Sequence, residues 1–271
     1  MPLIEIRNVS LSYGGRQVLD RIHLAIDEGE FVCLLGQTGC GKSTLLRLVL
    51  GSERPASGEI LVDGRVHHQP DRTRGYVPQK YSLFPDKTVL DNITFGPEVC
   101  EFGLWTRLTP RFFRRRREYR REAFDYLRRI GLTRTDAAKY PDQLSGGMQQ
   151  RVAIAQALIT RPRILLMDEA FSALDPGTRK GMQRLIRQLW RETGCTILFV
   201  THNTHEALQL GTRIVVLARE PAAAGSRVML DLPVPEPCHE DEIPRLVRRL
   251  ESVSSPLDSL APAASALSEK W

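Results

Sequence analysis

The chain has 271 residues, of which 42% are apolar, and its formal net charge is +6. This length suits one large α/β domain, or one domain with a small appendage, and this apolar fraction argues against wholesale disorder. The mild positive excess fits an anionic ligand, a nucleic acid or a membrane surface, and does not choose among the three.

The number and spacing of the cysteines and the lengths of the apolar runs indicate the cellular compartment. The cysteines are odd in number and form no CxxC pair, which argues against a disulfide framework or a zinc site and favours a reducing compartment. They are Cys33, Cys40, Cys100, Cys195 and Cys238. The N-terminus lacks the pattern of a signal peptide, and no run approaches the roughly 20 apolar residues of a bilayer-spanning helix. These features predict a cytoplasmic protein that meets a membrane only through a partner or a surface patch.

The N-terminal part of the chain reads as short strands around one glycine-rich loop. Apolar and β-branched residues predict strands over 3–9, 18–26, 31–35, 59–62 and 75–77. The stretch 42–50 predicts a helix that ends at Gly51. Residues from 80 to about 145 have mixed loops and a helical stretch near 118–130, which predicts a helical subdomain.

Farther along, helices and strands alternate. The pattern predicts helices over 146–160, 178–191 and 204–210, and strands over 163–167, 196–200 and 213–217. Such alternation favours a parallel sheet covered by helices. Beyond Glu220 the composition shifts to Pro, Ala and Ser. We therefore expect one domain over 1–220 and a short extension over 221–271, with a charged helix near 240–251 and disorder in the last twenty or so residues.

A phosphate-binding loop follows the predicted strand 31–35. The run matches GxxxxGK(S/T) between a strand and a helix, which is the context that this motif requires. Its residues are Gly36, Gln37, Thr38, Gly39, Cys40, Gly41, Lys42, Ser43 and Thr44. The glycines let backbone N–H groups converge on phosphate oxygens, Lys42 supplies a positive charge for the β- and γ-phosphates, and Ser43 can bind Mg²⁺. The predicted ligands are ATP and Mg²⁺.

Two carboxylates end the apolar strand predicted at 163–167. Open α/β sheets place ligands at the carboxyl ends of their strands. Asp168 is therefore a candidate ligand for Mg²⁺, and Glu169 is a candidate base for the attacking water. Taken alone, this pair is equally consistent with two solvated acids at the end of a strand.

A third motif narrows the class. The run Leu144-Ser145-Gly146-Gly147-Met148-Gln149-Gln150-Arg151 resembles the signature of the ABC transporter ATPase family. The resemblance implies an α/β P-loop fold with a mostly parallel core sheet, an antiparallel β subdomain and a helical subdomain. It also implies that Ser145, Gly146, Gly147 and Gln149 contact the nucleotide held by a second ATP-binding subunit.

Other positions of that family occur in order. Tyr13 matches the aromatic residue that stacks on adenine, and Gln79 matches the glutamine that contacts Mg²⁺ and the attacking water. Asp175 lies in a run similar to the loop through which two cassettes sense each other. His202 is similar to the histidine that contacts the γ-phosphate. With Lys42, Gln79 and Glu169, His202 completes the expected catalytic set, and the expected metal ligands are Ser43, Gln79 and Asp168.

The resemblance extends from residue 3 to about 218. Runs at 84–93, 144–158 and 171–176 look most like bacterial importer ATPases of the nitrate, sulfonate and taurine type. Asn203 and Ala170 depart from that pattern, since aspartate and proline are usual there. The resemblance implies a dimer on the inner face of the cell membrane, with integral membrane permease subunits and a solute-binding protein. No nucleic-acid partner is expected.

Alternatives remain open at this point. They are the ATPase of an exporter or lipid transporter, a soluble ABC-type ATPase acting on nucleic acid or ribosomes, and a non-hydrolysing regulatory relative. Because no catalytic group is missing, the last is disfavoured. The arginines between 111 and 121 fit a solvated helix face, a membrane-facing patch with Phe112 and Phe113 as anchors, or a nucleic-acid patch.

Overall fold

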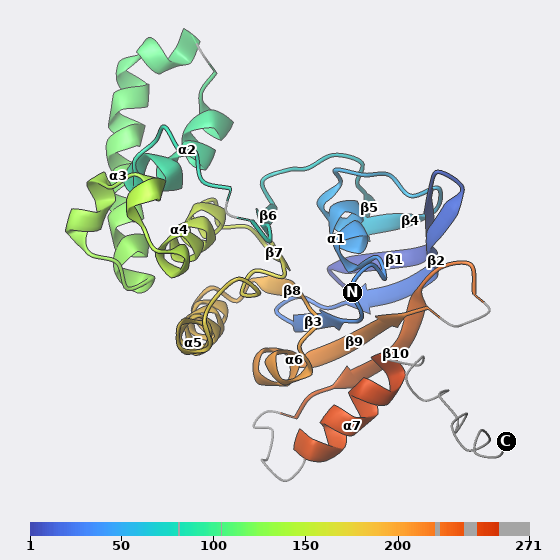
Figure 1. Cartoon of the computed structure of the whole chain (residues 1–271). Helices are drawn as coiled ribbons and strands as arrows, with labels where there is room; N and C mark the ends of the chain where they lie inside the picture. Colours follow the sequence, from blue (N-terminus) through green and yellow to red (C-terminus); the bar gives the residue numbers. More distant parts are fainter. Residues whose placement is uncertain (81, 104, 220–222, 236–242, 255–271) are drawn as a thin grey trace, which may run out of the picture.

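A six-stranded sheet forms the centre of the molecule (Figure 1). The computed structural model describes residues 1–80, 82–103, 105–219, 223–235 and 243–254. The strand order is β10-β9-β3-β8-β7-β6. The strands are β3 (Phe31–Leu35), β6 (Arg74–Val77), β7 (Ile164–Asp168), β8 (Thr196–Thr201), β9 (Arg213–Ala218) and β10 (Arg227–Pro233). All neighbours pair in parallel except β10, which runs antiparallel to β9.

The two faces of this sheet carry different helices. Side chains alternate between faces along a strand, so Val32 and Leu34 join one buried cluster while Cys33 and Leu35 join another. The first cluster includes α1 (Lys42–Leu50). The second includes α4 (Gly146–Leu158), α5 (Pro176–Thr193) and α6 (Thr204–Leu210). The helix after the phosphate loop and the helix after the signature run therefore cover opposite faces.

A smaller antiparallel sheet packs over α1. Its order is β2-β1-β4-β5, and its strands are β1 (Ile4–Tyr13), β2 (Arg16–Ile26), β4 (Ser57–Val62) and β5 (Arg65–Val66). Ile4, Ile6 and Val9 of β1 are buried in the same cluster as Leu45 and Leu46 of α1. The phosphate-loop helix is thus packed against apolar side chains of both sheets.

Helices between β6 and α4 form a separate lobe that stands away from the sheets (Figure 1). They are α2 (Val89–Glu101), η1 (Trp105–Leu108), α3 (Pro110–Arg129), η2 (Arg134–Ala138) and η3 (Pro141–Gln143). The helix predicted at 118–130 begins eight residues earlier. Proline is favoured in the first turn of a helix, because it has no N–H to leave unpaired there, and Pro110 occupies that place. The arginine run therefore lies on a continuous helix.

The chain after residue 220 completes the core sheet. Strand β10 was not predicted, yet it pairs with β9, and Arg227 Nε donates to Asp20 at 2.7 Å. Helix α7 (Ile243–Ser254) packs beside α6 and β9, with Leu250 fully buried. The composition of the chain changes near residue 220, where the sequence predicts the end of the domain. The fold continues past that point, because β10 and α7 pack against the core. The disorder expected at the C-terminus falls largely on residues 255–271, outside those described. None of the described helices is long and apolar enough to cross a bilayer.

Candidate nucleotide-binding site

The phosphate loop connects the carboxyl end of β3 to α1, and its glycines are sterically required. A Cβ added to Gly36 would lie 2.2 Å from the carbonyl oxygen of Leu217. Gly39 and Gly41 have φ angles of +83° and +96°, in the region that side chains rarely adopt. The N-terminus of α1 has no side-chain cap. A glycine-rich loop that leads into an uncapped helix terminus fits a bound phosphate.

Lys42 turns its side chain back into this loop. Its Nζ donates to the carbonyl oxygens of Gly36 and Gln37, both at 2.8 Å, and the residue is buried. The ammonium group is therefore held inside the loop, where it can meet phosphate oxygens.

Ser43 and Asp168 bring two oxygen donors together beside the loop. Ser43 Oγ donates to Asp168 Oδ1 at 2.8 Å. Burial raises the pKa of Asp168 above its usual value, against the effect of the Ser43 hydrogen bond, and the nearby Glu169 charge raises it further. A hydroxyl and a carboxylate are ligands that suit Mg²⁺, and a cation would offset the desolvation of Asp168. The donor set fits the predicted metal.

Glu169 lies where three segments converge. Gln79 Nε2 donates to Glu169 Oε2 at 3.2 Å, and His202 Nδ1 lies 3.5 Å from Glu169 Oε1. Gln79 follows β6, Glu169 follows β7 and His202 follows β8. Glu169 also has a φ of +43°, which is uncommon for a residue with a side chain. The expected base, glutamine and histidine are thus in contact at the carboxyl edge of the sheet.

Tyr13 lies beside the phosphate-loop helix. Its hydroxyl donates to Glu53, whose carboxylate pairs with Arg47 of α1 at 2.8 Å. The side chain is 44% exposed, which leaves ring surface open to solvent. Its stacking on adenine stays a prediction.

The signature residues lie together on the other face. Ser145 caps α4 by accepting the N–H of Met148 at 3.3 Å. Asp175 caps α5 by accepting from the N–H of Gly177 and of Thr178. The hydrogen bond from the Thr178 hydroxyl, followed by these backbone hydrogen bonds, lowers the pKa of Asp175. A Cβ on Gly147 would meet Thr178 Cγ2 at 2.6 Å, so the two helix N-termini are in close contact.

Gln149 has a structural role within the chain. Its amide donates to the carbonyl oxygens of Pro141 at 2.8 Å and Leu144 at 3.3 Å. These bonds hold the turn that leads into α4. Its expected contact with a nucleotide stays a prediction.

A buried network behind His202 was missed by the sequence analysis. Thr201 Oγ1 donates to Glu206 Oε2 at 2.6 Å, and Gln183 Nε2 of α5 donates to Glu206 Oε1 at 3.2 Å. Asn203, one of the departures from the family pattern, caps α6 by accepting the N–H of Glu206 at 3.0 Å. Asparagine followed three residues later by glutamate is a capping pattern, and that signal could have identified the network.

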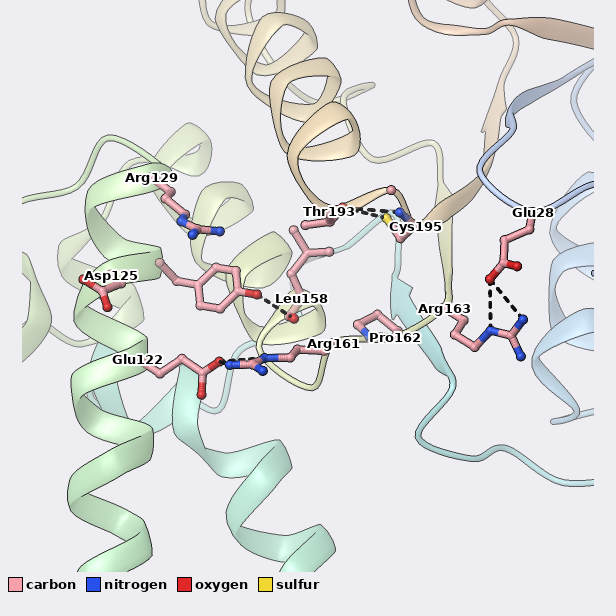
Figure 2. Close-up of a pocket in the computed structure, with 12 residues that line it drawn as sticks. Glu28, Glu122, Asp125, Arg129, Leu158, Arg161, Pro162, Arg163, Thr193 and Cys195 are labelled. Atoms are coloured by element: carbon pink, nitrogen blue, oxygen red, sulfur yellow. Dashed lines mark hydrogen bonds and ion pairs between the residues drawn. The ribbon is translucent and has the colours of Figure 1, made fainter.

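A cavity of about 480 Å³ lies at the opposite edge of the sheet (Figure 2). Its lining includes Glu28, Arg163 and Cys195, which stand just before β3, β7 and β8, at the amino ends of these strands. Ligands of parallel sheets bind at the carboxyl ends, so this cavity is not the nucleotide site. Across it, Arg161 Nη2 donates to Glu122 Oε1 of α3 at 2.7 Å, which ties the helical lobe to the core.

The fold and the phosphate loop together define a P-loop nucleotide-binding protein, and comparison with known proteins narrows the class. A model of the ABC transporter family matches residues 19–172, more than half of the chain. The spermidine/putrescine import ATP-binding protein PotA of Legionella pneumophila is 44% identical over 218 residues, which are 79% of this chain and 56% of that protein. The nitrate import ATP-binding protein NrtD of Synechococcus elongatus is 38% identical over 242 residues, 89% of this chain and 84% of that protein.

A solved structure agrees with these relatives. The dimeric post-hydrolysis state of the ATP-binding cassette MJ0796, bound to ADP and Pi, aligns with a TM-score of 0.70 at 32% identity. The alignment covers 86% of this chain and 99% of that one. The chain therefore belongs to the ABC transporter family, and it is an ATP-binding subunit with ATPase activity. This confirms the family and the fold that the sequence motifs predict.

Proposed function

We propose that the chain works as a dimer whose two composite ATP sites drive solute import through separate membrane-spanning subunits. The observation that carries the proposal is the division of the expected site between two faces. Lys42 begins α1 on one face of the sheet, whereas Ser145 caps α4 on the other. Two chains that face each other would bring Lys42 of one chain and Ser145 of the other to one γ-phosphate.

Each chain contributes one half of a composite ATP site, and the residues of that half have different roles. Tyr13 stacks on the base, while the loop amides of residues 36–44 and Lys42 hold the phosphates. Ser43, Asp168 and Gln79 hold Mg²⁺, which when bound offsets the charge of the phosphate oxygens. Glu169 accepts the proton of the attacking water, and its contacts with Gln79 and His202 orient the carboxylate.

The second chain supplies the rest of the site. Ser145 and the backbone amides of Gly146 and Gly147 stand at a helix N-terminus, whose partial positive charge favours the γ-phosphate. Asp175 lies at the adjacent helix N-terminus, where it can sense the state of the neighbouring ATP site. The dimeric form of the cassette MJ0796 supports this arrangement.

Import is the direction that the relatives support. PotA and NrtD carry the names of spermidine/putrescine and nitrate importers, one with cationic solutes and one with an anionic solute. Relatives with such different solutes do not identify the solute of this chain, but both names support import. Permease subunits and a solute-binding protein are part of the same proposal. The protein then works on the inner face of the cell membrane.

One experiment tests the shared site and the partners together. Lys42→Ala and Ser145→Arg damage opposite halves of each composite site, so a mixed dimer keeps one sound site and each homodimer keeps none. The two variants, carrying different tags, are co-expressed and purified through both tags from detergent-solubilised membranes. We expect the mixed dimer to hydrolyse ATP while both homodimers do not, and an integral membrane protein to accompany it. A proven mixed dimer without ATPase activity would contradict a pair of two-sided sites that work independently. Recovery with ribosomes or nucleic acid instead would contradict the transport role.

A further inference from the structure

The arginines on the first three turns of α3 fall into two groups. Four of them meet acidic residues: Arg111 and Arg115 pair with Glu101, Arg116 pairs with Asp91 and Glu98, and Arg120 pairs with Asp91. The acids lie on α2, at distances of 3.0 to 3.5 Å. These four arginines therefore hold α3 against α2.

The other three are exposed and unpaired. Arg114, Arg117 and Arg121 make no ion pair with any residue that the structure describes. Their spacing of three and four residues places them on one stripe of the helix. No partner within the described chain accounts for this stripe of positive charge.

Large apolar side chains are exposed on η1 and the start of α3. Trp105 is 88% exposed, Leu108 is 78% exposed and Phe113 is 55% exposed. Leu108 and Phe113 line one shallow hollow together with Arg114, Arg117 and Arg121. Phe112 does not belong to this surface, contrary to the expectation that both phenylalanines act as anchors, because it is buried against Phe102. We call Trp105, Leu108, Phe113, Arg114, Arg117 and Arg121 the basic–apolar face.

We propose that the basic–apolar face binds the surface of an anionic lipid bilayer. Arginine side chains bind lipid phosphates, while aromatic and leucine side chains enter the boundary between headgroups and acyl chains. The face lies on η1 and the first part of α3, at the outer end of the helical lobe (Figure 1). It therefore reaches a surface without blocking the nucleotide site. The inference rests on the proposed placement of the protein at the membrane.

A nucleic acid suits the same face less well. Single strands bind grooves in which aromatic rings follow one another along the backbone path. Here the exposed rings, Trp105 and Phe113, stand at one end of a helix, and Leu108 offers no stacking surface. Exposed aliphatic and aromatic groups beside unpaired arginines match a bilayer interface better.

Vesicle flotation of the full chain tests the proposal. The vesicles are phosphatidylcholine alone or phosphatidylcholine mixed with phosphatidylglycerol, at low and high salt. We expect salt-sensitive binding to the anionic vesicles only. The triple variant Arg114→Gln, Arg117→Gln and Arg121→Gln should bind about 100-fold more weakly, because each basic group near an anionic surface contributes roughly a factor of five. Trp105→Ser with Phe113→Ser should weaken the binding that remains at high salt.

A matched control removes the same charge elsewhere. Arg245, Arg248 and Arg249 are exposed on α7, which lies far from the helical lobe in Figure 1. Their replacement by Gln should leave vesicle binding unchanged. Equal binding by the wild type and the Arg114/Arg117/Arg121 variant, or no binding by the wild type, would overturn the proposal. Tighter binding to a single-stranded or duplex oligonucleotide than to anionic vesicles would overturn it too.

ATP hydrolysis, measured on the same samples, separates this inference from the proposed function. Vesicle binding without ATP hydrolysis would count against the ATPase site alone. ATP hydrolysis that persists in a protein unable to bind vesicles would count against the basic–apolar face alone.

Discussion

At the end of β7, Glu169 adopts a left-handed backbone conformation that costs a residue with a side chain about 1 kcal/mol or more. Its surroundings hold it there. Its N–H donates to Val200 at 3.0 Å, and its carbonyl oxygen accepts the Ser172 hydroxyl at 2.9 Å. The conformation turns the carboxylate toward Gln79 and His202. Strain held at this one position is consistent with a carboxylate placed for chemistry.

Removing the charge of Glu169 tests its assignment as the base. Glu169→Gln keeps the shape of the side chain but cannot accept a proton from water. ATP binding should persist, turnover should fall by about 10²–10⁴-fold, and an ATP-bound dimer should accumulate. Nucleotide binding, steady-state hydrolysis and size-exclusion chromatography with ATP measure these three properties. Glu122→Gln, a carboxylate at the remote cavity, is the control, and turnover near wild type in Glu169→Gln would reject the assignment.

At the scale of elements, the contact between α4 and α5 connects the signature run to the loop that contains Asp175. Gly147 and Thr178 leave no room for a methyl group between the two helix N-termini. Threonine is stiff at χ1, so it cannot easily turn its methyl away. The lack of a side chain at residue 147 therefore sets how closely the two termini approach.

A methyl group inserted there should displace Ser145. Gly147→Ala should lower ATP hydrolysis by about 10- to 100-fold, since a shift near 1 Å at a reacting site has effects of that size. Thr178→Ser removes the clashing Cγ2 and keeps the hydroxyl, so the double variant should regain most of the activity. Steady-state hydrolysis of both single variants and the double variant measures this. If Gly147→Ala is fully active, or if Thr178→Ser does not rescue it, the contact does not control the signature run.

The predictability of each element followed the strength of its local signals. Helix α1 was predicted to the residue, because Gly41 and Gly51 mark its two ends with left-handed conformations. Strands β3 and β7 are buried on both faces and so read as unbroken apolar runs. The predicted helix is shorter than α3, because the arginine-rich start of α3 has no apolar periodicity. Ion pairs to α2 hold these first turns instead.

Tertiary contacts explain what was missed. No residue of strand β10 is fully buried. Its position depends on pairing with β9 and on the Arg227–Asp20 pair, whose two residues are distant in sequence. The phosphate loop, Asp168 and Glu169 could be predicted because each lies in a short, continuous sequence motif. The Thr201–Glu206–Gln183 network was missed because it joins two helices and a strand that only the fold brings together.

For the whole molecule, β10 and α7 close the edge of the core sheet. A chain that ends at residue 225 would expose the edge of β9 and lose the buried Val234 and Leu250. We expect it to lose roughly 3–6 kcal/mol of unfolding free energy relative to a chain that ends at residue 254, from apolar burial alone. Urea denaturation of the two chains measures the difference. Because both chains lack residues 255–271, equal midpoints would show that β10 and α7 do not stabilise the core.

The placement of α1 and α4 on opposite faces of the sheet has a kinetic consequence. On the proposed arrangement no single chain is a complete catalyst, so the rate at low concentration rises with the square of the amount of protein. Dilution then lowers the activity per chain, and a plot of the hydrolysis rate against protein concentration curves upward before it becomes linear. A membrane complex that holds two copies side by side removes this dependence, and the abundance of that complex would then limit the rate.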